Sequence, residues 1–312
     1  MTLFRRLCIA STIATFAQIS IGGLVRATKS GLGCGTDWPD CGGRLVPALK
    51  TRAEIIEFSH RAAASVVVIL LMATAGYALW RLRDQPRIVG TSLAALGLVL
   101  FQAGLGAAVV IFELKADLVV VHLATALALL ALLVVLTTDA AARDGALDDP
   151  VDPTTSRTLM NVAAAVLGLV LVGSYVTGRG AGFVFTDWPL MDGKVIPDLS
   201  VQLYALHFFH RALAAIVGVI VFWSLVRISR QRVDLPAVSR LAMLAMGLFG
   251  IQILIGAANV WTGLNPVAVT AHLMTAAAIW GTLVTMAALT HPALRASPVP
   301  TPRAEPAFEG GN

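Results

Sequence analysis

Hydrophobic residues run along this 312-residue chain in eight long stretches that short polar segments separate. An α-helix needs about 20 apolar residues to cross the hydrocarbon core of a bilayer, and every stretch reaches that length. The pattern therefore predicts an all-α integral membrane protein. Its eight transmembrane helices are expected at residues 7–26, 55–80, 88–112, 118–138, 158–178, 204–226, 238–262 and 266–290.

Composition supports lipid as the solvent of this chain. Charged residues make up 13% of it and hydrophobic residues 57%, whereas a soluble domain has about 25% charged residues. The net charge of +5 comes from arginines in short loops, without a basic block interleaved with aromatic residues. This distribution excludes nucleic acid as a partner and leaves membrane lipid.

Arginines also predict the orientation in the membrane. The segment 81–87 carries three of them and the segment 227–240 carries four, while the competing loops 113–117 and 263–266 hold a single lysine, Lys115. Short loops rich in Lys and Arg stay in the cytoplasm. Both termini are then cytoplasmic, and the long loops 27–53 and 179–203 face outward.

An internal repeat divides the chain. Thr36-Asp37-Trp38-Pro39 recurs 150 residues later as Thr186-Asp187-Trp188-Pro189, and the same offset relates further residues from 23 to 276 without a gap. Matched tryptophan, proline and histidine in one register indicate a duplication. Because each repeat has four helices, the two are parallel and related by a pseudo-twofold axis along the membrane normal. The expected parts are a repeat at 1–138, a cytoplasmic linker at 139–157, a repeat at 158–291 and a disordered tail at 292–312.

Four of the six histidines fall on the repeat: His60, His122, His210 and His272. Ionisable residues inside a membrane usually face the interior of the bundle. A lone buried histidine often only donates a hydrogen bond, but two matched pairs at one depth favour a cofactor. A bare metal ion would usually need three or four protein ligands. Haem iron needs two axial ligands, so the pattern predicts one haem between the helices of each half.

The halves differ three residues before the first histidine of each pair. Glu57 precedes His60, whereas His207 precedes His210, and a spacing of three places both members on one helix face. A carboxylate in one half only favours chemistry in that half. The alternative is that Glu57 merely lies near a helix start, where the helix dipole favours an acid.

Cysteines and arginines near the outer surface leave further alternatives. Cys34 and Cys41 share the first outer loop, where an oxidising compartment favours a disulfide. They can also be a redox-active pair. Arg61 and Arg211 follow histidines at the outer rim, and they either pair with haem propionates or extend to the interface.

Together these residues resemble the haem A synthase family over nearly the whole chain. The motifs that carry the resemblance are Gly22 to Thr28 with Ser30-Gly31, Cys34 through Trp38-Pro39 to Cys41, Glu57 to Arg61, Gln102 to Gly106, His122, His210-Arg211 and His272.

The resemblance implies an enzyme of the bacterial plasma membrane that oxidises a methyl group of haem O to the formyl group of haem A, for cytochrome oxidase. It implies haem b as the cofactor on His210 and His272, and substrate haem on His60 and His122 with Glu57 as the catalytic residue. The reaction would be successive hydroxylation followed by loss of water, with electrons from the cofactor haem and Glu57 accepting or relaying protons.

The resemblance also implies a Cys34–Cys41 disulfide and two candidate partners, a haem O synthase and an electron donor. Some relatives have a second cysteine pair in the later outer loop. This chain has Val184 and Met191 at the corresponding positions, which places any mechanism that needs the second pair in doubt.

Two other functions fit part of the pattern. A di-haem b electron carrier linked to quinol would have the same four histidines, but it gives no reason for Glu57 or for the cysteine pair. A transporter with parallel repeats would have broken helices at the midplane, whereas the matched polar residues here gather at the outer end.

Overall fold

The computed structural model describes residues 2–144, 152–231 and 234–294. Its long helices confirm the eight predicted spans, since each is long and apolar enough to cross a membrane. They are α1 (Leu3–Ala27), α2 (Arg52–Arg81), α3 (Pro86–Ile111), α4 (Ala116–Arg143), α5 (Pro153–Gly178), α6 (Gln202–Ser229), α7 (Pro236–Trp261) and α8 (Pro266–Thr290); the short 3-10 helices are η1 (Ala181–Phe183) and η2 (Pro292–Leu294).

Local sequence signals place several helix starts. The Thr51 side chain accepts from the backbone N–H of Glu54, and the Glu54 carboxylate accepts from that of Thr51, which is a capping box at the start of α2. Helices α3, α5, α7 and α8 begin with proline, whose missing N–H costs nothing at a first helical position. Asp152 also caps α5 through two backbone N–H groups.

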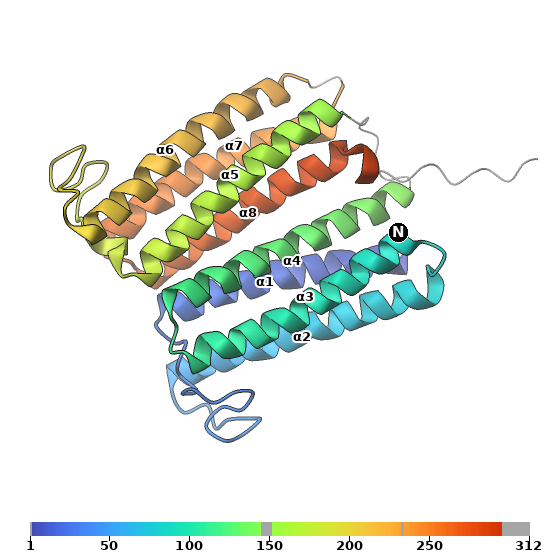
Figure 1. The fold of residues 1–312 in the computed structure, drawn as a ribbon, viewed down its shortest axis with the longest axis horizontal. Coiled ribbons are helices and arrows are strands. Elements are labelled where there is room, and N and C mark those ends of the chain that lie inside the picture. Colours follow the sequence, from blue (N-terminus) through green and yellow to red (C-terminus); the bar gives the residue numbers. More distant parts are fainter. Residues whose placement is uncertain (1, 145–151, 232–233, 295–312) are drawn as a thin grey trace, which may run out of the picture.

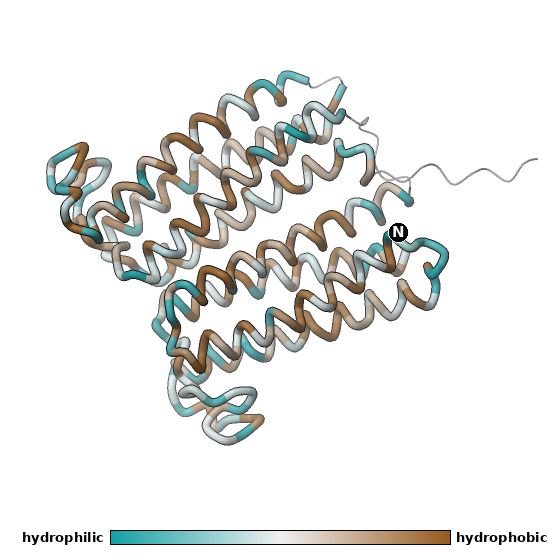
Figure 2. Tube along the Cα trace, viewed as in Figure 1, coloured by the Kyte–Doolittle hydropathy of each residue, from teal (hydrophilic) through white to brown (hydrophobic). Residues whose placement is uncertain are grey.

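The helices form two groups, α1–α4 and α5–α8, that pack together (Figure 1). The seam between them consists of α1 and α4 on one side and α5 and α8 on the other. One core cluster crosses this seam and includes Ile19, Leu127, Leu159 and Trp280. Helices α2, α3, α6 and α7 lie on the outside, and apolar colouring continues along their length (Figure 2). Their exposed aliphatic and aromatic residues suit contact with lipid.

Both long loops lie at one end of the bundle, and the N-terminus lies at the other (Figure 1). Each loop contains a tight two-residue turn, with Cys41 paired to Arg44 and Met191 paired to Lys194. The turn residues Gly42-Gly43 and Asp192-Gly193 all have positive φ. Glycine and aspartate suit this conformation, so the repeat preserves the turn while its residues differ.

The structure corrects the register of the repeat in its first helix. In α1 and α5, buried Phe4, Cys8, Ser11 and Thr15 correspond to buried Thr155, Leu159, Val162 and Val166, an offset of 151. Lys29 and Gly180 share a positive φ at the same offset. The expectation of an ungapped offset of 150 from residue 23 was therefore wrong. The N-terminal half has one additional residue between Lys29 and Thr36, the segment that contains Cys34. Because Cys34 and Phe185 are both buried, Cys34 corresponds to Phe185 and not to Val184.

The helices extend into the predicted linker 139–157, because α4 ends at Arg143 and α5 begins at Pro153. Asp139 lies inside α4, where it forms an ion pair with Arg143 at 3.6 Å. Residues 145–151 lie outside the described residues, as does most of the predicted tail, of which Pro292–Leu294 form η2.

Candidate haem-binding histidines and the outer loops

Each of the four repeated histidines lies opposite a glycine of a neighbouring helix. A methyl group at Gly22 of α1 would lie 3.1 Å from Cε1 of His60, and one at Gly173 of α5 would lie 3.0 Å from Cε1 of His210. Gly106 and Gly256 face His122 and His272 in the same way, at 3.4 and 3.3 Å. These glycines give the imidazoles room between helices, which a side chain would fill.

The histidines pair within each half. His60 and His122 lie close enough to interact electrostatically, as do His210 and His272. A glutamine fixes the second helix of each pair: the amide of Gln102 donates to the backbone carbonyl of His122 at 2.8 Å, and Gln252 does the same for His272 at 3.0 Å. The two histidines of each half thus lie within one four-helix group, on α2 and α4 or on α6 and α8. Their pairing as ligands of one iron stays a prediction.

The imidazoles have the chemistry that axial ligands of haem need. Nδ1 of His122, His210 and His272 is buried without a hydrogen-bond partner, and a buried polar atom without a partner calls for an explanation. Within the described residues, no three His, Cys, Asp or Glu side chains gather where they could hold a metal ion. Two imidazoles per half and no third ligand suit haem iron, whose porphyrin supplies the other four nitrogens.

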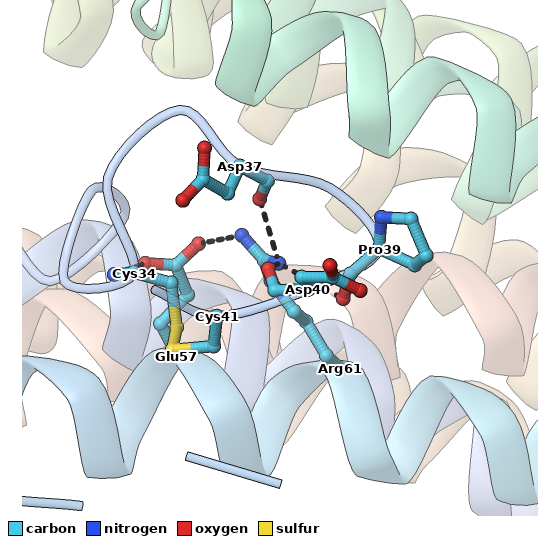
Figure 3. Close-up of polar contacts among 7 residues, drawn as sticks. All are labelled: Cys34, Asp37, Pro39, Asp40, Cys41, Glu57 and Arg61. Carbon is cyan, nitrogen blue, oxygen red and sulfur yellow. Dashed lines mark hydrogen bonds and ion pairs between the residues drawn. A yellow bond between two sulfur atoms is a disulfide. The ribbon is translucent and has the colours of Figure 1, made fainter. Parts of the chain in front are cut away.

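Glu57 anchors the first outer loop onto α2 (Figure 3). Glu57 as a residue is 3% exposed. It accepts a hydrogen bond from the backbone N–H of Cys34 at 2.8 Å and forms an ion pair with Arg61 at 2.6 Å. Removing one partner of a buried ion pair typically costs about 3–5 kcal/mol. The sequence offered chemistry or a helix-start role for Glu57, and the loop contact is a third role that it did not predict.

Arg61 continues the same anchor. Its guanidinium donates to the backbone carbonyls of Asp37, Pro39 and Asp40, at 2.9, 3.3 and 2.6 Å. Arg211 makes the equivalent contacts in the second half, to the carbonyls of Pro189 and Leu190 at 3.4 and 2.9 Å. Both arginines therefore hold the outer loops against the helices.

His207 replaces Glu57 in the second half and holds its loop differently. Its Nδ1 lies 2.7 Å from the backbone carbonyl of Ala181, and its Nε2 accepts from Nε of Arg211 at 2.8 Å. A ring nitrogen that accepts from arginine carries no proton, so the proton lies on Nδ1 and the ring is neutral. The same helix position thus has a carboxylate, Glu57, in the first half and a neutral imidazole, His207, in the second.

The predicted disulfide is confirmed, because Cys34 and Cys41 are bonded. Cys8 is free and buried in α1. The loop reaches this position through Gly33, where a side chain would clash with the backbone of Ala53 at 2.4 Å. The disulfide lies directly beside Glu57, because the Glu57 carboxylate accepts a hydrogen bond from the backbone N–H of Cys34.

The fold and the site define an integral membrane protein with a matched pair of interhelical histidines in each half. The family model for COX15-CtaA, described as cytochrome oxidase assembly protein, matches residues 5–284, so the chain belongs to this family. It is 30% identical to the haem A synthase of Symbiobacterium thermophilum, over 94% of this chain and 97% of that protein. It is also 32% identical to the haem A synthase of Halalkalibacterium halodurans and 30% identical to that of Alkalihalophilus pseudofirmus, in each case over 74% of this chain and 80% of the relative.

Proposed function

We propose that this protein is a haem A synthase, which oxidises a methyl group of haem O to the formyl group of haem A for cytochrome oxidase. Family membership supports the activity. The observation that carries the proposal is the matched histidine pairs, each half-buried opposite glycines and, among the described residues, without a further protein ligand.

The two halves have different tasks in this proposal. His210 and His272 hold a resident haem b that supplies one-electron chemistry when bound, and His60 and His122 hold the substrate. Substrate is assigned to the first half because of the Glu57 carboxylate, which is three residues from His60 on the same face of α2. Its carboxylate, already an acceptor of two hydrogen bonds, can take a proton that the methyl oxidation releases.

The proposal includes the surroundings of the enzyme. The chain spans the bacterial plasma membrane with cytoplasmic termini, as the arginines at the inner ends of α2 and α6 favour. The linker 139–157 then lies in the cytoplasm between a substrate repeat at 1–138 and a cofactor repeat at 158–291. A haem O synthase supplies the substrate, and a separate donor provides electrons.

Haem extraction from the purified protein tests this function. The protein is produced in cells that supply haem O, and its haems are identified by chromatography. A haem A synthase yields haem A together with haem b. A di-haem electron carrier would yield haem b alone, and a transporter of another solute would yield no haem.

A further inference from the structure

Gln18 of α1 contacts the imidazole of His60, a contact with no counterpart at the other histidines of the pairs. Its amide nitrogen donates to the backbone carbonyl of His60 at 2.9 Å and lies 3.1 Å from Nδ1 and 3.5 Å from Nε2 of the same residue. An amide oxygen at this place would face the carbonyl as a second acceptor, so the nitrogen is the atom that lies there. Both ring nitrogens of His60 are thus within reach of one amide group.

The rest of the Gln18 amide is poorly satisfied. Its Oε1 atom is buried without a hydrogen-bond partner. A buried acceptor without a partner is unfavourable. The amide is therefore held by its nitrogen alone, and moving it away from His60 breaks no hydrogen bond to its oxygen.

The second half has no such group. The register of α1 and α5 places Leu169 at the position of Gln18, and an offset of 150 would place Gly168 there. Leu169 packs against the hydrophobic core, and Nδ1 of His210 has no partner. The imidazole of His210 is therefore free of amide contact, whereas that of His60 is not.

We propose that Gln18 is a positioning residue that makes the His60 site exchangeable. Iron must bind a ring nitrogen that the Gln18 amide already contacts. Haem binding therefore displaces this contact, and the affinity of the His60 site for haem falls by the free energy of the contact. A substrate site must release its product, whereas a cofactor site must retain its haem. The inference rests on the proposed assignment of substrate to His60 and cofactor to His210.

Two reciprocal variants of the full-length protein test the role. Gln18→Leu gives the first half the residue of the second, and Leu169→Gln does the opposite. Haem O is titrated into detergent-purified protein that retains its resident haem, and release is followed by transfer to apomyoglobin. One neutral hydrogen bond predicts that Gln18→Leu binds haem O about fivefold to tenfold more tightly and releases it correspondingly more slowly. Leu169→Gln loses the resident haem faster by a similar factor.

The sign of the effect separates this role from a structural one. A glutamine that only holds α1 against α2 would give weaker binding when replaced. Gln102→Leu is the control at His122, because it removes the same amide-to-carbonyl bond without a contact to the ring, together with a hydrogen bond that Gln102 accepts from Thr125. The proposal is overturned if Gln18→Leu leaves haem O affinity unchanged or lowers it as Gln102→Leu does.

A separate pair of variants tests the assignment of the halves. His60→Ala abolishes haem O binding if the substrate lies there, and His210→Ala does not. The opposite result overturns the proposed assignment, whatever Gln18 does. Haem O binding that depends on His60 but not on Gln18 overturns the present inference alone.

Discussion

The two outer loops are held by the same helix positions with opposite chemistry. In the first half, Glu57 accepts an N–H from Cys34, and a disulfide closes the loop. In the second half, His207 contacts the carbonyl of Ala181, and buried Phe185 and Met191 stand where the first half has its cysteines. At this helix position the duplicated scaffold has a buried carboxylate in the first half and an imidazole in the second. We infer that this asymmetry separates a reacting site from a holding site.

The largest expected effect comes from neutralising that charge. Glu57→Gln should lower haem A production about 100-fold or more, the usual contribution of a positioned acid or base, and leave the resident haem spectrum intact. Arg61→Gln loosens the loop but keeps the carboxylate, so its effect should be smaller. Haem A per unit protein is the measurement. Equal losses in the two variants would mean that Glu57 acts only as a loop anchor.

Filling the glycine spaces should separate the halves by their haems. Gly173→Val places a side chain against His210, and overpacking of about 1–3 kcal/mol predicts resident haem b bound about fivefold to 150-fold more weakly. Gly22→Val should instead weaken haem O binding and spare haem b. Gly104→Ala is the control, because nothing lies within 4 Å of the added methyl group. Haem content after gel filtration reports both effects, and equal loss in the two variants would argue against separate sites.

The disulfide should make a moderate contribution. Cys34→Ser with Cys41→Ser removes a short closed loop, and a loss of about 2 kcal/mol in unfolding free energy is expected, at the lower end of the usual range. Because Cys34 also binds Glu57, haem A production should fall with it while haem b stays. Denaturant unfolding checks the stability. In the parent protein, thiol labelling under denaturing, non-reducing conditions should find Cys8 alone. Labelling of three thiols would show that the Cys34–Cys41 disulfide is absent in solution.

The smallest effect is a pH dependence of the second loop. The backbone N–H groups of Gly193 and Asp192 bind the carboxylate of Asp187 and lower its pKa from 3.8. A lowered folded-state pKa means that this stabilisation is complete above pH 3.8 and is lost as the pH falls through the folded-state pKa. Hydrogen exchange of these two amides should accelerate over that range. In Asp187→Asn it should not change with pH beyond the intrinsic rate, and the same acceleration there would assign the effect to another group.

Hydropathy predicted every membrane helix, since lipid requires long apolar stretches, but it missed several helix ends. Helix α1 begins at Leu3 and includes Arg5 and Arg6, because polar residues at a membrane boundary can continue a helix. The repeat singled out the four histidines as candidate haem ligands. It could not give the register of α1, because Gly22 and Gly23 are adjacent and either one aligns with Gly173. Only burial and backbone angles distinguish the two alignments.

The sequence did not predict the contact of Gln18 with His60 or the hydrogen-bond partners of Glu57, for different reasons. The repeat gave no signal for Gln18, because its counterpart is apolar. The available signal was its polarity inside a membrane helix, four residues before Gly22 and so on the same face. Glu57 binds the backbone of Cys34, and the path of a loop backbone does not follow from side-chain patterns.

The central claim is that each histidine pair holds one haem and that the two haems differ. Its most direct test is the haem content of the four variants that replace His60, His122, His210 and His272 by alanine. A haem that loses one axial ligand is five-coordinate and is more easily lost. The account predicts that the His210 and His272 variants lose haem b, whereas the His60 and His122 variants keep haem b and fail to convert haem O. Haem b lost from the His60 and His122 variants and retained in the other two would contradict it.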